Sequence, residues 1–338
     1  MEKLFLKYDG YTECLLCPHF CRLAVGRKGI CGVRKNNGEE IELTTYGVVS
    51  GFSVDPVEKK PLYHFFPGMH ILSMGSYGCN MRCDFCQNWS ISQGVPDRMP
   101  VRISPERIAA DAASAKHNIG LAFTYNEPIV WFEFMRDIAV MIKKEGMYTV
   151  MVSNGFVNSM PLTEIIGFID AFNIDLKAFN STFYKKLTGA DPEPVKNTLK
   201  QISKAGRHLE ITTLVIPGRN DSDEEMLDES RWIAGELGDE TPLHLSRYYP
   251  TYRRNDPATP QSTLERLFDI ASLNLKNVYL GNVASAKGQD TACSGCGTVV
   301  TKRSGYNIMH KGLDDNGRCR ICGKRVYENF SFSSRRGH

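Results

Sequence analysis

The chain has 338 residues, of which 42% are hydrophobic and 23% are charged, and its formal net charge is +3. These values are ordinary for a globular protein with a sizeable core, and the charge is too small to indicate a nucleic-acid or membrane partner. No run reaches the ~18 apolar residues that a membrane-spanning helix needs, and the charged first ten residues are not typical of a signal peptide. We therefore expect a cytoplasmic protein that has no membrane association and for which nucleic acid is an unlikely partner.

The eleven cysteines are the strongest signal, because they fall into three tight groups. In a reducing compartment, clustered thiols indicate metal ligands rather than disulfides. We divide the chain accordingly into an N-terminal metal lobe with four cysteines (1–45), a central barrel (46–288) and a C-terminal zinc-ribbon-like lobe (289–338). The groups are Cys14, Cys17, Cys21 and Cys31; Cys79, Cys83 and Cys86; and Cys293, Cys296, Cys319 and Cys322.

The N-terminal group offers four thiolates within eighteen residues, which is enough for a closed zinc site or for an auxiliary [4Fe–4S] cluster. His19 could compete as a ligand. The spacing does not decide between the two metals. We favour zinc slightly, because nothing else in the sequence suggests an electron relay, and the cluster stays open as the alternative.

The central part alternates short apolar runs with amphipathic helical runs. This alternation predicts right-handed βαβ units and a parallel sheet, in a full or partial TIM-like (β/α) barrel with its active site at the carboxyl ends of the strands. A doubly wound open sheet is the alternative. Ser104 before Pro105 predicts a helix start, and Ser222 with Glu225 predicts a capping box. The predicted strands are 71–74, 121–124, 148–152, 171–175, 209–216, 243–247 and 278–280.

Three cysteines, Cys79, Cys83 and Cys86, lie in the loop that follows the first of these strands. Their Cys-x3-Cys-x2-Cys spacing can supply three corners of a cubane cluster. Such clusters normally take four cysteines, so the fourth iron is left open to an external chelator. An open coordination position distinguishes a reactive metal site from a structural one.

This spacing, with Phe85 before the last cysteine, resembles the signature of the radical S-adenosylmethionine (SAM) superfamily. Residues 55–64, Gly78–Asn80, Asn154–Phe156 and Asp175–Lys177 resemble the pyruvate formate-lyase activating enzyme group, and most of all the AmmeMemoRadiSam radical SAM enzymes. The resemblance implies a cluster that binds SAM and cleaves it to a 5′-deoxyadenosyl radical, which abstracts hydrogen from substrate. It also implies a reductant such as flavodoxin or ferredoxin, and Memo-like and AMMECR-like partners.

The same resemblance assigns SAM-facing and substrate-facing roles to residues at successive strand ends. Relatives carry two glycines before Glu127 in the strip that binds the SAM amino group, whereas this chain has Tyr125 and Asn126. Where Thr212 stands, relatives often carry arginine. The expected cofactor contacts are Phe85, Asn126, Glu127, Ser153, Asn154, Asp175, Lys177, Thr212, His244 and Arg247.

The C-terminal group, Cys293-x2-Cys296 and Cys319-x2-Cys322, is close to the pattern of a structural zinc site with four cysteine ligands. With four, three and four cysteines assigned, none is spare, which argues against radical SAM RNA methylases that need extra catalytic cysteines. We expect a radical SAM enzyme of the oxidoreductase- or lyase-activating type that acts on a peptide, protein or small molecule. A glycyl-radical-enzyme activase and a zinc-ribbon binding or scaffold protein are the alternatives.

Overall fold

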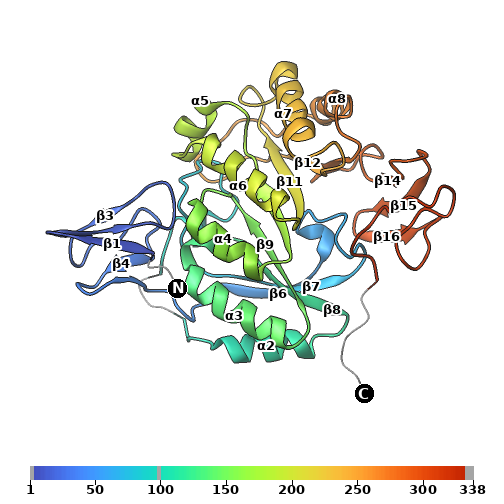
Figure 1. Cartoon of the computed structure of the whole chain (residues 1–338). Coiled ribbons are helices and arrows are strands. Elements are labelled where there is room, and N and C mark those ends of the chain that lie inside the picture. Colours follow the sequence, from blue (N-terminus) through green and yellow to red (C-terminus); the bar gives the residue numbers. More distant parts are fainter. Residues whose placement is uncertain (1–3, 97–99, 332–338) are drawn as a thin grey trace.

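The computed structural model describes residues 4–96 and 100–331, and an eight-stranded sheet forms its centre (Figure 1). The strand order is β13-β12-β11-β10-β9-β8-β7-β6. All pairs from β7 to β13 are parallel, whereas β6 (Gly51–Pro56) pairs antiparallel with β7. The seven parallel strands confirm the predicted ones: β7 (His70–Gly75), β8 (Asn118–Phe123), β9 (Tyr148–Ser153), β10 (Ala171–Asp175), β11 (His208–Val215), β12 (Leu243–Arg247) and β13 (Val278–Gly281).

The strand order decides between the two predicted architectures. The parallel strands follow one another in chain order with no reversal, whereas a doubly wound sheet reverses its order at a switch point. The doubly wound alternative is therefore wrong. Within the described residues, no hydrogen bonds pair β6 with β13, which are the two edge strands. The sheet is therefore open, and a fully closed barrel is not observed.

Helices connect successive strands, and they pack their apolar sides onto the sheet (Figure 1). In the described residues, none is long and apolar enough to cross a bilayer. They are α1 (Trp89–Ser92), α2 (Pro105–Ser114), α3 (Phe132–Lys144), α4 (Ser159–Phe168), α5 (Ser181–Phe183), α6 (Pro192–Lys204), α7 (Asp223–Glu236) and α8 (Gln261–Ala271), with 3-10 turns at Val57–Lys59 and Pro128–Trp131 and a π-helical turn at Tyr184–Thr188.

The two predicted helix starts differ in outcome. Ser104 caps α2 by accepting a hydrogen bond from the Arg107 N–H, as predicted. Ser222 caps α7 in the same way, but the Glu225 carboxylate does not complete a capping box. It accepts instead from the Asn180 side chain and the Phe179 N–H, because these donors lie across the loop after β10.

Short strands flank the central sheet on opposite sides (Figure 1). Buried side chains of the N-terminal strands, such as Leu16 and Leu23, belong to the main core. The C-terminal strands form a small core of their own around Val300 and Tyr327. The N-terminal strands are β1 (Phe5–Tyr8), β2 (Tyr11–Cys14), β3 (Arg22–Leu23), β4 (Arg34–Asn36) and β5 (Ile41–Leu43); the C-terminal ones are β14 (Thr291–Ala292), β15 (Val299–Ser304) and β16 (Asn307–His310).

Gly120 in β8 tests how tightly the sheet is built. A Cβ there would overlap the backbone of its partner Tyr148 in β9. We predict that Gly120→Ala lowers the free energy of unfolding by about 1–3 kcal/mol, the usual range for overpacking. Gly167→Ala is the matched control, because a Cβ on this exposed residue of α4 would meet nothing within 4 Å. It should stabilise the protein by about 0.5–1 kcal/mol. Denaturant unfolding measures both, and equal effects would contradict the packing.

Candidate active site

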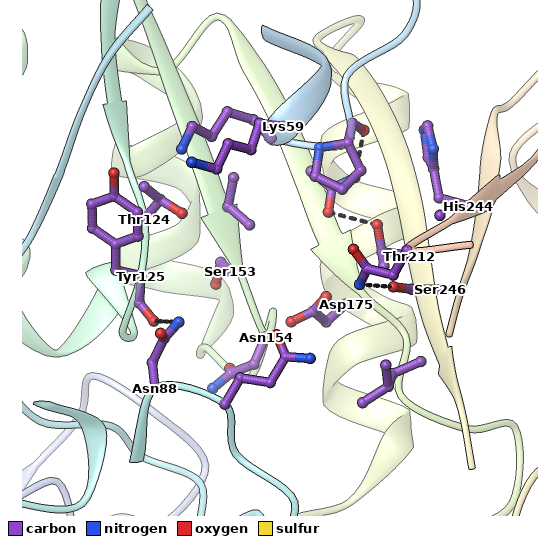
Figure 2. Close-up of a pocket in the computed structure, with 18 of the residues that line it drawn as sticks. Lys59, Asn88, Thr124, Tyr125, Ser153, Asn154, Asp175, Thr212, His244 and Ser246 are labelled. Atoms are coloured by element: carbon purple, nitrogen blue, oxygen red, sulfur yellow. Dashed lines mark hydrogen bonds between the residues drawn. The ribbon is translucent and has the colours of Figure 1, made fainter. Parts of the chain in front are cut away.

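A cavity of about 720 Å³ opens where the carboxyl ends of the parallel strands meet (Figure 2). Ligand sites in barrels of this kind lie at that end, and ligand pockets typically measure ~300–1,000 Å³. Side chains from several strand ends point into it, among them Thr124, Ser153, Asp175, Thr212 and Ser246. The cavity is therefore large enough for a nucleotide-sized ligand.

One wall of the cavity is the loop of residues 75–88, here called the cluster loop. Its three cysteines, Cys79, Cys83 and Cys86, line the cavity together, and no fourth cysteine among the described residues does so. Burial raises the pKa of Cys83 to about 12, so the metal-free thiol is protonated and metal binding must release its proton. Three thiolates beside an open space are the donor set that the sequence predicted.

Contacts outside the cavity hold the cluster loop in place. Gly78 has φ +87°, and a Cβ on it would lie 2.6 Å from the Cys31 carbonyl oxygen, so only glycine fits. Arg254 forms two hydrogen bonds with the Asp84 carboxylate, which lies between two of the cysteines. Charge-assisted pairs with this two-point geometry fix orientation. The loop is thus positioned from both sides before any metal binds.

The structure brings together all but one of the predicted contact residues. Arg247 does not line the cavity: its Nε donates to the Thr259 carbonyl and its guanidinium lies 5.0 Å from the Tyr249 ring centroid. The prediction placed it on the strand end correctly, but the side chain leaves the cavity to hold the next loop. The predicted residues that line the cavity are Phe85, Asn126, Glu127, Ser153, Asn154, Asp175, Lys177, Thr212 and His244.

Glu127 is buried, and three donors surround its carboxylate. Oε1 accepts from the Ser153 hydroxyl at 2.8 Å and from the Ile129 N–H at 3.0 Å. Oε2 accepts from the Asn154 N–H at 2.8 Å. Burial raises the pKa of Glu127 to about 7, although these hydrogen bonds favour the charged form. The carboxylate joins the ends of β8 and β9 beside Cys79.

Tyr125 and Asn126 stand where the resemblance led us to expect glycines, and both are held by hydrogen bonds. Tyr125 keeps a left-handed backbone with φ +71°, which is unusual for a residue other than glycine. Its hydroxyl donates to Asp55 at 3.0 Å, and its carbonyl accepts from Asn88 at 2.7 Å. The Asn126 side chain bonds the backbone of Ser76 and Gly78 at 3.0 and 2.8 Å. These contacts hold the strip against the cluster loop.

Lys177 supplies a positive charge near the cysteines. Its Nζ donates to Asp175 at 2.9 Å. Burial opposes the charged form, but Asp175 and the Cys83 sulfur outweigh it and raise the pKa of Lys177. A partly buried ammonium that lines the cavity near the cysteines is suited to an anionic ligand there.

Comparisons with known proteins agree with this geometry. The radical SAM superfamily model matches residues 74–229. An uncharacterized protein of Methanocaldococcus jannaschii is 40% identical over 322 residues, which is 94% of this chain and 96% of that protein. Residues 74–229 therefore form a radical SAM domain. Such a domain implies a [4Fe–4S] cluster and SAM, and three cysteines beside a nucleotide-sized cavity fit both.

More distant radical SAM relatives cover less of the chain. The pyruvate formate-lyase 1-activating enzyme of Escherichia coli is 26% identical over 168 residues, 47% of this chain and 65% of that enzyme. A radical SAM methyltransferase from Sphaerobacter thermophilus matches at TM-score 0.51 with 16% identity, over 64% of this chain and 67% of that one. At that identity the structural match shows the fold alone. The narrower resemblance to AmmeMemoRadiSam enzymes stays a prediction.

The sequence did not indicate two lysines that also line the cavity. Lys59 and Lys60 both donate to Asp55, at 2.9 and 2.7 Å, and both line the cavity with Tyr125. Lys60 also lies 4.9 Å from the Tyr125 ring centroid. Residues 55–64, with their two adjacent lysines, were the only sign of this arrangement in the sequence. The ion pairs with Asp55 depend on strand β6, which the sequence did not predict.

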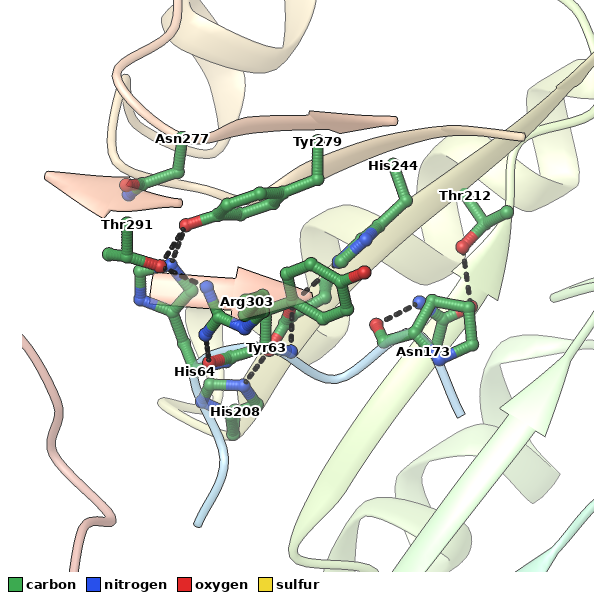
Figure 3. A network of polar contacts seen from close by, with 12 residues as sticks. Tyr63, His64, Asn173, His208, Thr212, His244, Asn277, Tyr279, Thr291 and Arg303 are labelled. Carbon is green, nitrogen blue, oxygen red and sulfur yellow. Dashed lines mark hydrogen bonds and ion pairs between the residues drawn. The ribbon is translucent and has the colours of Figure 1, made fainter. Parts of the chain in front are cut away.

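Glu210 organises a polar network that borders the cavity, and its histidine partners are labelled in Figure 3. Its buried carboxylate accepts from the backbone N–H groups of Tyr63 and His64 at 2.9 and 2.7 Å, and contacts His208 and His244 at 2.9 and 2.7 Å. Burial opposes ionisation, yet the hydrogen bonds from both histidines hold the pKa of Glu210 well below its usual range. His244 therefore lines the cavity in a fixed orientation.

The C-terminal strands β14–β16 and their cysteines, here called the C-terminal ribbon, attach to this network. Arg303 of the ribbon donates to the Tyr63 carbonyl at 2.9 Å and lies 4.3 Å from the Tyr63 ring centroid. Gly305 and Tyr306, at the turn between β15 and β16, line the cavity. The four ribbon cysteines offer ligand atoms that all lie within 4.8 Å of one another.

Glu210→Gln tests the network. A glutamine amide has one acceptor oxygen for four donors, and each buried group left unpaired costs about 1–3 kcal/mol. We predict that the variant unfolds at clearly lower denaturant concentration than wild type. Glu193→Gln is the control, because that side chain is 67% exposed and its loss should change stability by less than about 0.5 kcal/mol. Indistinguishable midpoints for the two variants would contradict the assigned role.

Proposed function

We propose that this chain uses a [4Fe–4S] cluster on Cys79, Cys83 and Cys86 to cleave SAM reductively and abstract a hydrogen atom from a substrate in the same cavity. The observation that carries the proposal is the trio of cysteines on the wall of a 720 Å³ cavity that no fourth cysteine of the described residues reaches. A cluster held there would have one iron free for an external ligand.

When bound, the cluster and SAM would supply the redox chemistry, in which one electron from an external reductant would cleave SAM to methionine and a 5′-deoxyadenosyl radical that takes hydrogen from substrate. The protein residues bind and orient. Lys177 would hold the SAM carboxylate, and the strip at Tyr125–Glu127 would hold its amino group. Asn154, whose amide lies 3.7 Å from the Cys79 sulfur, would fix the cluster edge. Thr212, Ser246 and His244 lie across the cavity and would face the adenosyl group or substrate.

The similarity to the E. coli pyruvate formate-lyase 1-activating enzyme supports a second candidate, the activation of a partner enzyme by making a glycyl radical. A reductant of the flavodoxin or ferredoxin type and a peptide or protein substrate would serve either function. Mass spectrometry and electron paramagnetic resonance (EPR) separate them: a modified product indicates the first, and a stable radical on a polypeptide indicates the second. The Memo-like and AMMECR-like partners remain predictions from resemblance.

We also propose zinc in the C-terminal ribbon. Tetrahedral zinc with Zn–S bonds of ~2.3 Å places its sulfurs ~3.8 Å apart. The Cys293–Cys322 and Cys296–Cys319 sulfurs lie 3.5 and 3.7 Å apart. The donor set thus supports a structural role. A scaffold function built on this ribbon alone would leave the cavity and its cysteines without a purpose.

Reductive cleavage is tested by incubating the reconstituted, anaerobically reduced protein with SAM. We expect 5′-deoxyadenosine and methionine, measured by chromatography. Cys83→Ala should lose both the SAM-sensitive EPR signal and the nucleoside, because two thiolates do not hold the cluster. Exposed Ser90, near the same loop, provides the control Ser90→Ala, which should retain both. Undiminished 5′-deoxyadenosine from Cys83→Ala would refute the proposal.

Lys177→Ala separates SAM binding from cluster assembly. Hydrogen bonds to charged groups contribute about 1.5–3 kcal/mol, so we predict a rise of about tenfold or more in the KM for SAM. Iron content at the cluster loop should be unchanged. Lys177→Arg should recover part of the affinity, and exposed Lys185→Ala should behave as wild type. An unchanged KM in Lys177→Ala would remove Lys177 from the proposed site.

A further inference from the structure

A second, smaller cavity lies among the N-terminal strands. Cys14, Cys17, Cys21 and Cys31 all line it, and apolar side chains such as Leu16 form much of the remaining wall. We propose that these four cysteines, the N-terminal cysteine site, hold a second [4Fe–4S] cluster rather than the zinc that the sequence slightly favoured. Iron at this site would be independent of SAM cleavage at the cluster loop.

The separation of the sulfurs distinguishes the two metals. Around a single zinc ion all four sulfurs contact one another, ~3.8 Å apart. In a cubane each thiolate binds a different iron, so the sulfurs stand farther apart with the cluster between them. Over residues 4–96 and 100–331, only the ribbon cysteines form a group of three or more ligand atoms mutually within 4.8 Å. The N-terminal cysteine site is wider than that.

The N-terminal sulfurs also border an open space, because all four cysteines line a small cavity of about 20 Å³. The cysteines of the cluster loop share this arrangement. Cys79, Cys83 and Cys86 also line a cavity, and within the described residues their sulfurs do not all lie within 4.8 Å of one another. The N-terminal site therefore resembles the cluster loop and differs from the ribbon.

The surroundings suit a buried, negatively charged metal centre. Arg34 is 2% exposed and lines the cavity, and its charge acts on Cys14 and Cys31. Two of its nitrogens bond Glu133, at 2.8 and 2.6 Å, but its buried Nε has no hydrogen-bond partner among the residues that the structure describes. Four thiolates on a cubane carry net negative charge, and a fixed buried guanidinium offsets part of the cost of burying it.

His19, the competing ligand considered from sequence, is engaged elsewhere. Its Nε2 lies 2.7 Å from the Asn80 carbonyl oxygen, in the cluster loop, and its ring packs edge-on against Phe156. The Asn80 side chain links this contact to the cluster loop cysteines. Its Oδ1 accepts a hydrogen bond from the Asn154 amide, which also lies near the Cys79 sulfur. Four cysteines thus remain as ligands, directly against the cluster loop.

The decisive test removes the other iron site. The triple variant Cys79→Ala, Cys83→Ala, Cys86→Ala leaves the N-terminal cysteines untouched. After anaerobic reconstitution with iron and sulfide, we expect about four irons and about four sulfides per chain, with one zinc. The reduced protein should give a cubane EPR signal that does not respond to SAM. Two zinc ions and no iron would overturn the proposal.

Variants in the intact background assign the iron to its site. The double variant Cys17→Ser, Cys21→Ser leaves two thiolates, which do not hold a cluster, so it should lose about four irons and keep the SAM-sensitive signal of the cluster loop. Cys296→Ser, in the ribbon, should lose only zinc. The Cys17 and Cys21 side chains are both partly exposed, so serine can replace them with little disturbance of the core. Iron in the triple variant that survives both N-terminal substitutions would place it elsewhere and refute the assignment.

Discussion

The close contact between Gly78 and the Cys31 carbonyl fixes the position of the cluster loop. Because a Cβ at Gly78 would lie 2.6 Å from that oxygen, the loop reaches the N-terminal strands at backbone distance. From the other side, the Asn126 side chain donates a hydrogen bond to the Gly78 carbonyl. The three cysteines that follow are therefore placed by two parts of the chain at once. An N-terminal segment that shares the main core is what makes this rigid.

The strands and the metal groups could be predicted because their signals are local. Short β-branched runs such as 148–152 indicate strands by their composition alone. The cysteine spacing likewise indicates a metal site without knowledge of any distant residue. The strand β6 was missed because most of its residues are exposed or only partly buried, so it shows no apolar run. The alternation of strands and helices predicted the order of the parallel strands. It did not predict that the sheet stays open, with β6 and β13 as its two edges.

The features of the site that the sequence did not predict depend on distant partners. Glu210 is explained only by the N–H groups of Tyr63 and His64, which lie 147 and 146 positions away in sequence. Arg247 occupies a strand end as expected, yet a loop carbonyl draws its side chain out of the cavity. Tyr125 keeps a glycine-like conformation because Asp55 and Asn88 hold it. Propensity describes a residue's average behaviour, whereas these contacts are specific to one fold.

The Glu210 network gives the C-terminal ribbon a part in the cavity. Arg303 binds the segment that Glu210 anchors, and the adjacent turn carries Tyr306 to the cavity rim. A ribbon held rigid by a metal can keep that turn in place, whereas a free hairpin of its length would be marginal. The N-terminal cysteines lie on the other side, against the cluster loop itself. Among the described residues, cysteines thus occur in three different settings, and the distances between the sulfurs, which sequence spacing does not reveal, set the compact ribbon group apart from the two wider ones.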